Sequence, residues 1–280
     1  MNRMPRHQLR VFDDGSLFAG SDANWKTRRY TATLLVALSE RPLELHIDGR
    51  VEHHTVVAIR PFVDRWLLLY RTPFVSVDMT PEHPAFAAFE AIGGHGCRAL
   101  SRERFAGLQR NLQALHAGQL HDPREAHRLH RRTTNLAATL LPDPPALDPR
   151  AAQARALLRS NPTLGAEELA RRCCLSPHRL SHLFSGELGI TLRQYQQWLK
   201  IQAAARFFGS GLSLTQIAAA AGFSDSPHFS KVWSQAYGMP PAFFFNNPDV
   251  AVQTWRASQA SRLKSRNAAN SHERMPTTSV

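Results

Sequence analysis

The sequence has few cysteines and no long apolar run, and both absences narrow the class of protein. Its 280 residues include only three cysteines, Cys97, Cys173 and Cys174. An odd number of cysteines without metal-ligand spacing favours a reducing compartment over a disulfide framework. No stretch approaches the roughly 18 apolar residues that a transmembrane helix needs, and no apolar segment follows the charged N-terminus as in a secretory signal. We therefore expect a cytoplasmic protein without a membrane partner.

Acidic residues are also scarce. The chain has 22 Asp and Glu against 34 Lys and Arg, which gives a net charge of +12. Residues 151–280 hold 14 basic against 6 acidic residues, whereas residues 1–150 hold 20 against 16. A basic excess in one part of a chain is typical of proteins that bind a phosphate backbone. An arginine-rich composition would also produce it, so charge alone does not decide the function.

The first half of the chain has the pattern of a small all-β domain. Short runs rich in Val, Leu and Ile lie at residues 31–38, 43–48, 55–59, 66–70 and 74–78, with turn signals between them. Asp48-Gly49 predicts a hairpin, because both residues tolerate a positive φ. We expect a small β-barrel. Its inward side chains would form either plain core or the wall of a pocket for an apolar molecule, and they are Leu34, Val36, Leu45, Ile47, Val57, Ile59, Leu67 and Leu69.

The pattern then becomes helical. One helix is expected after Ser101, and a second is expected to begin at Asp122-Pro123 and to reach about Leu140. The two helices could close the base of the barrel or pair with those of a second subunit, and both alternatives stay open. Residues 142–148 contain three prolines and are expected to be a stiff linker. The expected fold class is therefore α+β, with an all-α domain after the barrel.

Residues 164–243 contain the same helix-turn-helix pattern twice, about 48 residues apart. In the second copy, Ser213 and Ser224 are candidate helix N-caps, and Gly222 can take the left-handed conformation of a tight turn. After the turn the offset rises to 49, so the second turn has one extra residue. A helix over residues 191–208 connects the copies. The second helix of such a pair can enter the major groove of DNA.

The two expected recognition helices have an apolar face and a polar face. Leu180, Leu183 and Phe184 should face inward in the first copy, and Phe229, Val232 and Trp233 in the second. The residues left for DNA contacts are Ser176, His178, Arg179, Ser181 and His182 in the first copy and Ser224, Ser226, Pro227, His228 and Lys231 in the second. About half of this set should touch DNA, with the two helices in successive major grooves about 34 Å apart.

This pattern resembles the AraC family of bacterial transcription regulators over residues 150–245. The residues that carry the resemblance are Glu168-Leu-Ala170, Leu175-Ser-Pro177, Leu180-Ser181, Leu183-Phe184, Ala221-Gly-Phe223, His228-Phe-Ser230 and Tyr237-Gly-Met-Pro-Pro241. Cys174 departs from it where the family usually has Gly in the first turn, and Leu192 where Pro is common. The resemblance implies a cupin-like sensor and dimerisation domain over residues 1–141 and a DNA-binding domain over residues 149–246. It also implies that His178, Ser181 and His182 read bases.

The histidines do not have the spacing of a metal site. A catalytic cupin needs His-x-His with a carboxylate and a later His, whereas His53 and His54 are adjacent and point to opposite faces of a strand. We therefore expect no metal, no cofactor and no catalytic residues. Arg29, Arg60 and Trp66 are candidates for a ligand pocket at the barrel mouth.

The favoured hypothesis is a sequence-specific transcription regulator that responds to a small-molecule effector. Its partners would be double-stranded promoter DNA, RNA polymerase, the effector and a second copy in a homodimer. The alternative is a metal-dependent cupin enzyme with an accessory DNA-binding half. An alkyl-transfer repair protein would need spaced N-terminal cysteines, and only Cys97 lies outside the DNA-binding half. Residues 247–280 have little to bury and are expected to form a disordered basic tail.

Overall fold

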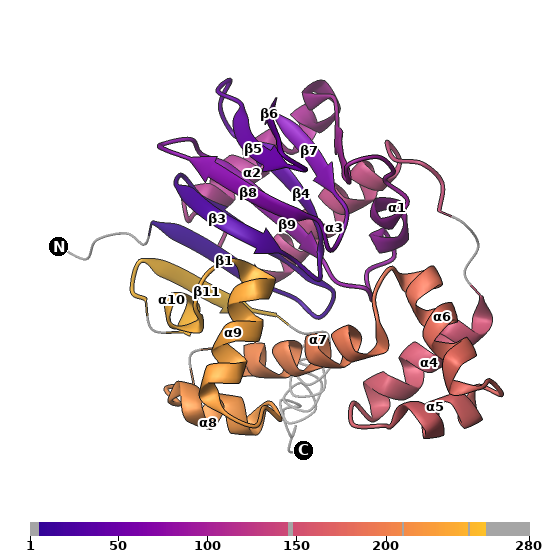
Figure 1. Ribbon diagram of the computed structural model, residues 1–280. Coiled ribbons are helices and arrows are strands. Elements are labelled where there is room, and N and C mark those ends of the chain that lie inside the picture. Colours follow the sequence, from indigo (N-terminus) through magenta and orange to yellow (C-terminus); the bar gives the residue numbers. More distant parts are fainter. Residues whose placement is uncertain (1–5, 145–147, 209, 246, 256–280) are drawn as a thin grey trace, which may run out of the picture.

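The computed structural model describes residues 6–144, 148–208, 210–245 and 247–255 (Figure 1). Two β-sheets and three helices form the N-terminal half, and the helical C-terminal half lies along one end of the sheets. The strands are β1 (His7–Val11), β2 (Gly15–Gly20), β3 (Ala23–Arg28), β4 (Ala32–Ala37), β5 (Leu43–Ile47), β6 (Arg50–His54), β7 (Val56–Ile59), β8 (Asp64–Leu69), β9 (Phe74–Met79), β10 (Cys97–Ala99) and β11 (Val250–Thr254).

The strands form two open sheets, so the predicted closed barrel is wrong. The larger sheet has the order β10-β7-β4-β9-β2-β1-β11, and the smaller has the order β3-β8-β5-β6. β6 continues into β7 through Thr55 alone, so the chain passes from one sheet to the other without a connecting loop. The expected hairpin joins β5 to β6, with Asp48 and Gly49 both at positive φ (49° and 71°).

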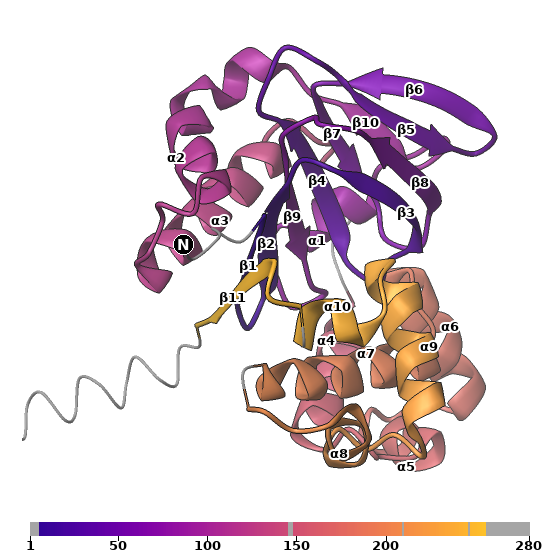
Figure 2. The same ribbon diagram turned by 90° about the vertical axis from the view of Figure 1, so that its left-hand side faces the viewer.

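The larger sheet is buried on both faces. Its inner strands β4 and β9 each have six buried residues in a row, because one face of the sheet contacts the smaller sheet and the other contacts helices (Figure 2). Leu34 and Val36 therefore pack in the core between the larger sheet and the helices. The sequence pattern had placed them with the inward-facing residues, and that prediction is wrong. The other six predicted inward residues lie in the cluster between the sheets, which continues into the C-terminal helices.

In the described part of the N-terminal half there are three α-helices: α1 (Phe86–Glu90), α2 (Ala106–His116) and α3 (Pro123–Ala138). Asp122 caps α3 by accepting a hydrogen bond from the backbone N–H of Arg124, with Pro123 in the first turn. Helix α2 buries Leu108, Leu112 and Leu115 against the larger sheet. Both helices thus bury apolar faces within the chain, which favours the intramolecular alternative for them.

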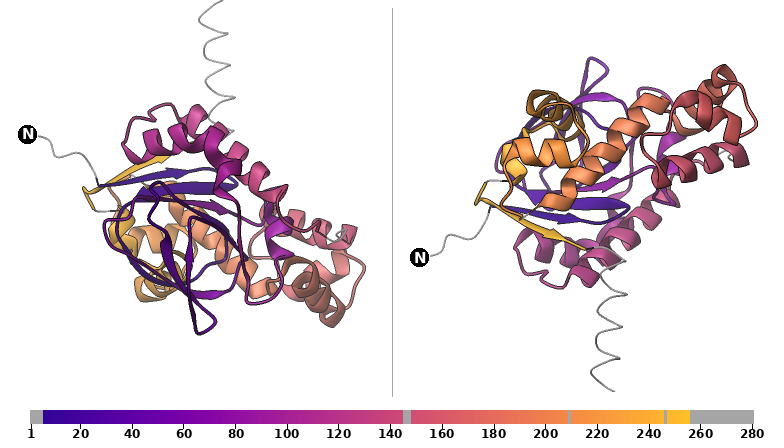
Figure 3. Two further views of the ribbon diagram at one scale, coloured as in Figure 1. Left: turned by 90° about the horizontal axis from the view of Figure 1, so that it is seen from above. Right: turned by 90° about the horizontal axis from the view of Figure 1, so that it is seen from below.

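Seven helices follow among the residues that the structure describes, and α7 spans the distance between the two helix-turn-helix units (Figures 1 and 3). They are α4 (Pro149–Ser160), α5 (Ala166–Arg172), α6 (Pro177–Leu188), α7 (Leu192–Ala204, extended by a 3₁₀ turn over Ala205–Phe207), α8 (Leu214–Ala220), α9 (Ser226–Tyr237) and α10 (Pro241–Phe245). Thr191 and Gln194 form a reciprocal capping box at the start of α7. That box fixes the helix start where Leu192 stands in place of a proline.

The prediction that residues 247–280 form a disordered tail is wrong for the first part of this segment. Residues 250–254 form β11, which pairs in parallel with β1 along the edge of the larger sheet. The short apolar run Val250-Ala-Val252 supplies the β pattern, and Val250 is buried. The remainder of the predicted tail, residues 256–280, lies outside the described residues. Within the described parts of the chain, no helix is both long and apolar enough to cross a membrane.

Candidate DNA-binding surface and effector pocket

The two helix-turn-helix turns have the same backbone geometry. In the first, Cys174 has a φ of 55°, and the backbone N–H of Leu175 donates to the carbonyl of Ala170 at 2.9 Å. In the second, Gly222 has a φ of 80°, and Phe223 donates to Ala218 at the same distance. Each residue of the first turn thus has its counterpart 48 residues later in the second turn. Cys174 therefore adopts the left-handed conformation that the repeat requires, although a side chain disfavours it.

The two recognition helices, α6 and α9, have different caps. Ser176 caps α6 by accepting from the backbone N–H of Arg179 at 3.2 Å. Asp225 caps α9 by accepting from the backbone N–H of His228 at 2.6 Å, so the predicted cap at Ser224 is wrong by one residue. The extra residue in the second turn explains the shift. The His228 N–H and the Ser224 hydroxyl hold the pKa of Asp225 below its usual value.

The residues predicted to contact DNA from α6 lie on its outer face. His178, Arg179, Ser181 and His182 are all exposed, while Leu180 and Phe184 are buried beneath them. The His178 and His182 rings lie one helical turn apart with centroids separated by 4.5 Å. This arrangement presents imidazole and guanidinium groups together on one side of the helix, where groove contact is possible.

The outer face of α9 is smaller. Pro227 and Lys231 are exposed, whereas Ser226 and His228 are half-buried. The His228 ring lies edge-on to Phe223 with a centroid distance of 5.6 Å, so part of it belongs to the turn. Phe229, Val232 and Trp233 are buried, as the sequence predicted. Lys231 is thus the one Lys or Arg in this helix.

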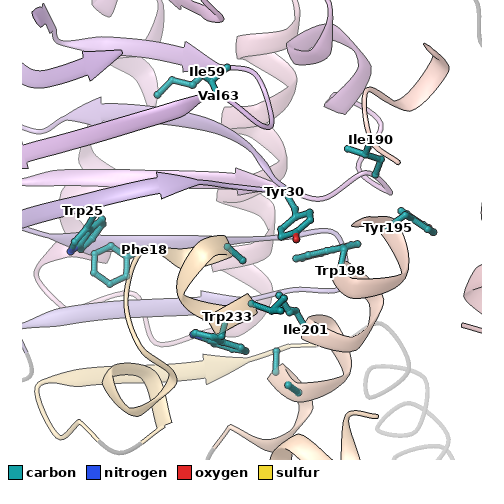
Figure 4. Packing of buried hydrophobic residues seen from close by; sticks show 14 of the residues in the cluster. Phe18, Trp25, Tyr30, Ile59, Val63, Ile190, Tyr195, Trp198, Ile201 and Trp233 are labelled. Atoms are coloured by element: carbon teal, nitrogen blue, oxygen red, sulfur yellow. The ribbon is translucent and has the colours of Figure 1, made fainter. Parts of the chain in front are cut away.

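An apolar cavity of about 90 Å³ lies between the larger sheet and the C-terminal helices. Figure 4 shows the surrounding aromatic packing, in which Tyr30 and Trp198 lie together and Trp233 lies beside Ile201. The wall of the cavity includes Phe18 and Trp25 from the N-terminal half and Trp198 and Trp233 from the helical half. The cavity has room for about three waters, so a larger ligand would have to move part of this wall.

The cavity is bordered by a buried ion pair. Arg29 Nη1 lies 2.9 Å and 2.8 Å from the two carboxylate oxygens of Asp78, and the Thr33 hydroxyl donates to Asp78 at 2.7 Å. Burial alone would raise the pKa of Asp78, but Arg29, the Thr33 hydroxyl and Arg65 keep it below its usual value. Burial and the neighbouring Arg29 lower the pKa of Arg65 to about 9. Two buried guanidinium groups therefore share one carboxylate.

Three N–H donors at the cavity have no acceptor in the described structure. They are Arg29 Nε, Trp198 Nε1 and Trp233 Nε1, each from a residue of the cavity wall. A buried donor without a partner is costly, and the cost is relieved when a ligand supplies an acceptor. Together with the excess buried positive charge, these donors suit a ligand that carries an anionic oxygen.

The three predicted pocket residues do not come together. Arg29 lies in the wall of the cavity. Trp66 lies in a separate, open hollow beside the smaller sheet, where its Nε1 donates to Asn24 at 2.7 Å. Arg60 is half-buried and borders neither space. Sequence reasoning missed Trp198 and Trp233 because they looked like ordinary core positions of the helical half.

The two halves also meet where the recognition helices end. Gly189 and Gly238 end α6 and α9 with φ of 61° and 76°. A Cβ at Gly189 would lie 2.3 Å from Glu90 Oε1, and one at Gly238 would lie 2.2 Å from Thr27 Cγ2. Burial raises the pKa of Glu90 to about 7, with Arg155 opposing the rise and Glu187 adding to it. Each recognition helix therefore contacts the N-terminal half through a glycine.

Comparisons with known proteins agree with this geometry. Residues 169–247 match the family model described as a helix-turn-helix domain. The arabinose operon regulatory protein of Escherichia coli (strain K12) is 34% identical over 77 residues, 27% of this chain and 26% of that protein. The HTH-type transcriptional regulator ArgR of Pseudomonas aeruginosa is 30% identical over 96 residues, 33% of this chain and 29% of that protein. The matches thus span less than a third of these relatives.

Solved structures share the whole architecture. ToxT from Vibrio cholerae with a bound unsaturated fatty acid is 12% identical, covers 88% of this chain and 98% of that chain, and has a TM-score of 0.52. ToxT bound to (E)-4-(8-methylnaphthalen-1-yl)but-3-enoic acid has a TM-score of 0.55 at 11% identity, and covers 87% of this chain and 99% of that chain. At these identities the likeness concerns the fold alone. The C-terminal half of the chain therefore contains a helix-turn-helix domain that is similar to those of these transcription regulators.

Proposed function

We propose that this protein is a sequence-specific transcription regulator that reads promoter DNA with α6 and α9. The observation that carries the proposal is the repeated turn geometry, which presents two polar helix faces within one family-matched domain. The similarity of the C-terminal half to transcription regulators favours this proposal over the enzyme alternative. Binding as a homodimer and contact with RNA polymerase at the promoter are part of the same proposal.

In this proposal, the two recognition helices have different tasks. His178, Ser181 and His182 on α6 face base edges, while the helix N-terminus at Ser176 holds a phosphate. Lys231 on α9 is a flexible point charge that contacts the backbone. We therefore expect sequence preference to depend mainly on α6 and general affinity to depend on both helices.

Two substitutions separate reading from positioning. We expect His182→Ala to cost about 1–3 kcal/mol on the preferred sequence and to relax preference at one or two base pairs. We expect Lys231→Ala to weaken binding to preferred and scrambled DNA alike and to reduce the salt slope by about one. The measurement is binding of the full chain to a duplex selected from a random library, and to its scrambled version, at several salt concentrations.

The control is Arg171→Ala. Arg171 is exposed on α5, forms an ion pair with Glu168 and lies outside both recognition helices. Its binding should stay close to that of the unaltered chain. If the library yields no preferred sequence, the proposed function is wrong. If His182→Ala loses equally on both duplexes, the residue contacts only backbone and α6 is not placed in the groove as proposed.

We further propose that the cavity binds a small effector with an apolar body and a carboxylate. The support is the set of unpaired donors, Arg29 Nε, Trp198 Nε1 and Trp233 Nε1, around an aromatic wall with excess buried positive charge. The ToxT structures that share this fold contain a bound unsaturated fatty acid and a bound substituted butenoic acid. Because Trp233 belongs to α9 and Trp198 to α7, a ligand there would act directly on a recognition helix and its link to the first unit.

The effector class can be tested with matched ligands. Monocarboxylic acids of increasing chain length should raise the melting temperature. At a hundredfold excess over Kd, a bound acid would add about 2.7 kcal/mol to the free energy of unfolding. The corresponding alcohols, which lack the charge, should have much smaller effects. Trp198→Phe and Trp233→Phe, which remove an N–H while keeping an aromatic ring, should each reduce the shift. Equal shifts with acids and alcohols would contradict the carboxylate.

A further inference from the structure

A cluster of metal-ligating side chains lies at the edges of the two sheets, away from the helices that face DNA. Glu52 and His54 come from the edge strand β6 of the smaller sheet, and Cys97 begins the edge strand β10 of the larger one. One ligand atom from each lies within 4.8 Å of the other two. Figure 2 shows β10 and the β5–β6 hairpin at the same end of the two sheets.

The local backbone explains why these side chains converge. Glu52 and His54 are two residues apart on a strand and therefore point to the same face. The segment His95-Gly-Cys97 approaches that face from the other sheet. Gly96 has a φ of 88°, and a Cβ there would lie 2.4 Å from Val63 Cγ2. Only glycine fits this turn, which brings both His95 and Cys97 toward Glu52.

The polar atoms are already in close contact. Glu52 Oε2 lies 2.7 Å from His54 Nε2 and accepts from Cys97 Sγ at 3.4 Å. His95 Nε2 lies 2.9 Å from Glu52 Oε1 and 3.2 Å from Cys97 Sγ. His95 thus contacts two members of the group from outside it. Cys97 is buried at 8% exposure, and the side chains of Glu52 and His54 are 20% and 14% exposed.

We propose that Glu52, His54 and Cys97 bind one Zn²⁺ ion, with His95 moving in as the fourth ligand. Thiolate, imidazole and carboxylate together are the ligands that Zn²⁺ takes in protein sites, with donors about 3.3–3.6 Å apart in a tetrahedron. The Cys97–Glu52 separation fits, and the shorter hydrogen-bonded separations open by roughly half an ångström. On binding, Cys97 loses its thiol proton to solvent and the metal replaces the hydrogen bonds.

The position of this site gives the metal a structural task. No backbone ladder joins β6 to β10 among the described strands, and on this side the chain links the two sheets where β6 runs into β7 through Thr55. A metal with ligands from both edges would link the sheets there. All four ligands belong to the N-terminal half, so the site is separate from the DNA-binding helices and from the cavity.

Cobalt and zinc titrations of the full chain test the proposal. Co²⁺ alone should bind at one equivalent and give the thiolate-to-cobalt charge-transfer absorption together with the visible bands of a tetrahedral site. Zn²⁺ should displace it and raise the melting temperature. Cys97→Ser and His54→Gln should each weaken binding by more than about 100-fold, since losing a ligand costs at least as much as losing its support. Cys97→Ser should also abolish the charge-transfer band, because it removes the thiolate.

The chain contains matched controls for each ligand type. His53→Ala changes the exposed neighbouring histidine, which points to Glu44 and not to the cluster. Cys173→Ser and Cys174→Ser change the two remaining thiols. All three should bind Co²⁺ with an unchanged spectrum. If the unaltered chain binds less than one equivalent, or if Cys97→Ser keeps the charge-transfer band, the site is not as proposed. Circular dichroism of Cys97→Ser and His54→Gln confirms that any loss does not reflect unfolding.

Discussion

Replacing Asp78 with alanine is expected to lower the free energy of unfolding by about 3–5 kcal/mol, since it removes one partner of a buried ion pair. Asp78 neutralises Arg29 directly and lies close enough to Arg65 to raise the pKa of that guanidinium. Without it, two buried positive charges would have no counter-ion, and the Thr33 and Ser76 hydroxyls would lose their acceptor. Chemical denaturation at neutral pH measures the change.

An exposed ion pair in the same half is the matched control for this experiment. Asp64 lies 3.6 Å from Arg28, with side chains that are 80% and 58% exposed. Asp64→Ala should change stability by less than about 1 kcal/mol, as expected for surface pairs. If Asp78→Ala were as mild, the Arg29–Asp78 pair would have to be hydrated in solution, and the excess buried charge that supports an anionic effector would be lost.

The second large effect concerns Glu90, whose pKa is raised by burial to about 7. A carboxyl group with a raised pKa contributes stability that is full below its unfolded pKa of 4.5 and is lost as pH rises through 7. We expect Glu90→Gln, which mimics the protonated form, to stabilise the protein at pH 8 by on the order of 2–3 kcal/mol and to have little effect at pH 4.5. Melting temperatures measured across this pH range provide the test.

The groups that face Glu90 set the size of this effect. Arg155 favours the ionised form, and Glu187 at the end of α6 disfavours it. Glu167→Gln, an exposed change on α5, is the control and should leave the pH profile of the unaltered chain unchanged. A Glu90→Gln profile parallel to that of the unaltered chain would show that Glu90 titrates normally and is hydrated at the interface.

The sequence predicts the local elements well because their signals are local. All five predicted strand runs overlap an observed strand, and the Asp122-Pro123 and Ser176-Pro177 caps begin helices as expected. The repeat predicted the left-handed conformation of Gly222 and the special position of Cys174. These features depend on a few neighbouring residues, whose backbone preferences and hydrogen-bonding groups are visible in the sequence.

Features that depend on distant contacts were not predictable in the same way. Alternation on β4 does not reveal that both faces of the strand are buried, so Leu34 and Val36 were placed on the wrong side. The carboxylate group of Glu52 meets Cys97 only because two sheet edges come together, 45 residues apart in sequence. The unpaired N–H groups of Trp198 and Trp233 likewise become meaningful only when the larger sheet covers them.

The glycines that end α6 and α9 bear on how interchangeable the two halves are. At Gly189 and Gly238 even one added carbon would collide with Glu90 or Thr27 of the other half. A DNA-binding half grafted from a similar regulator therefore needs glycine where α9 meets Thr27, whereas at the end of α6 the Glu90 side chain would have to move away from an added Cβ. The two halves therefore cannot change independently at these contacts, because a single added methyl group on one half would overlap a side chain of the other.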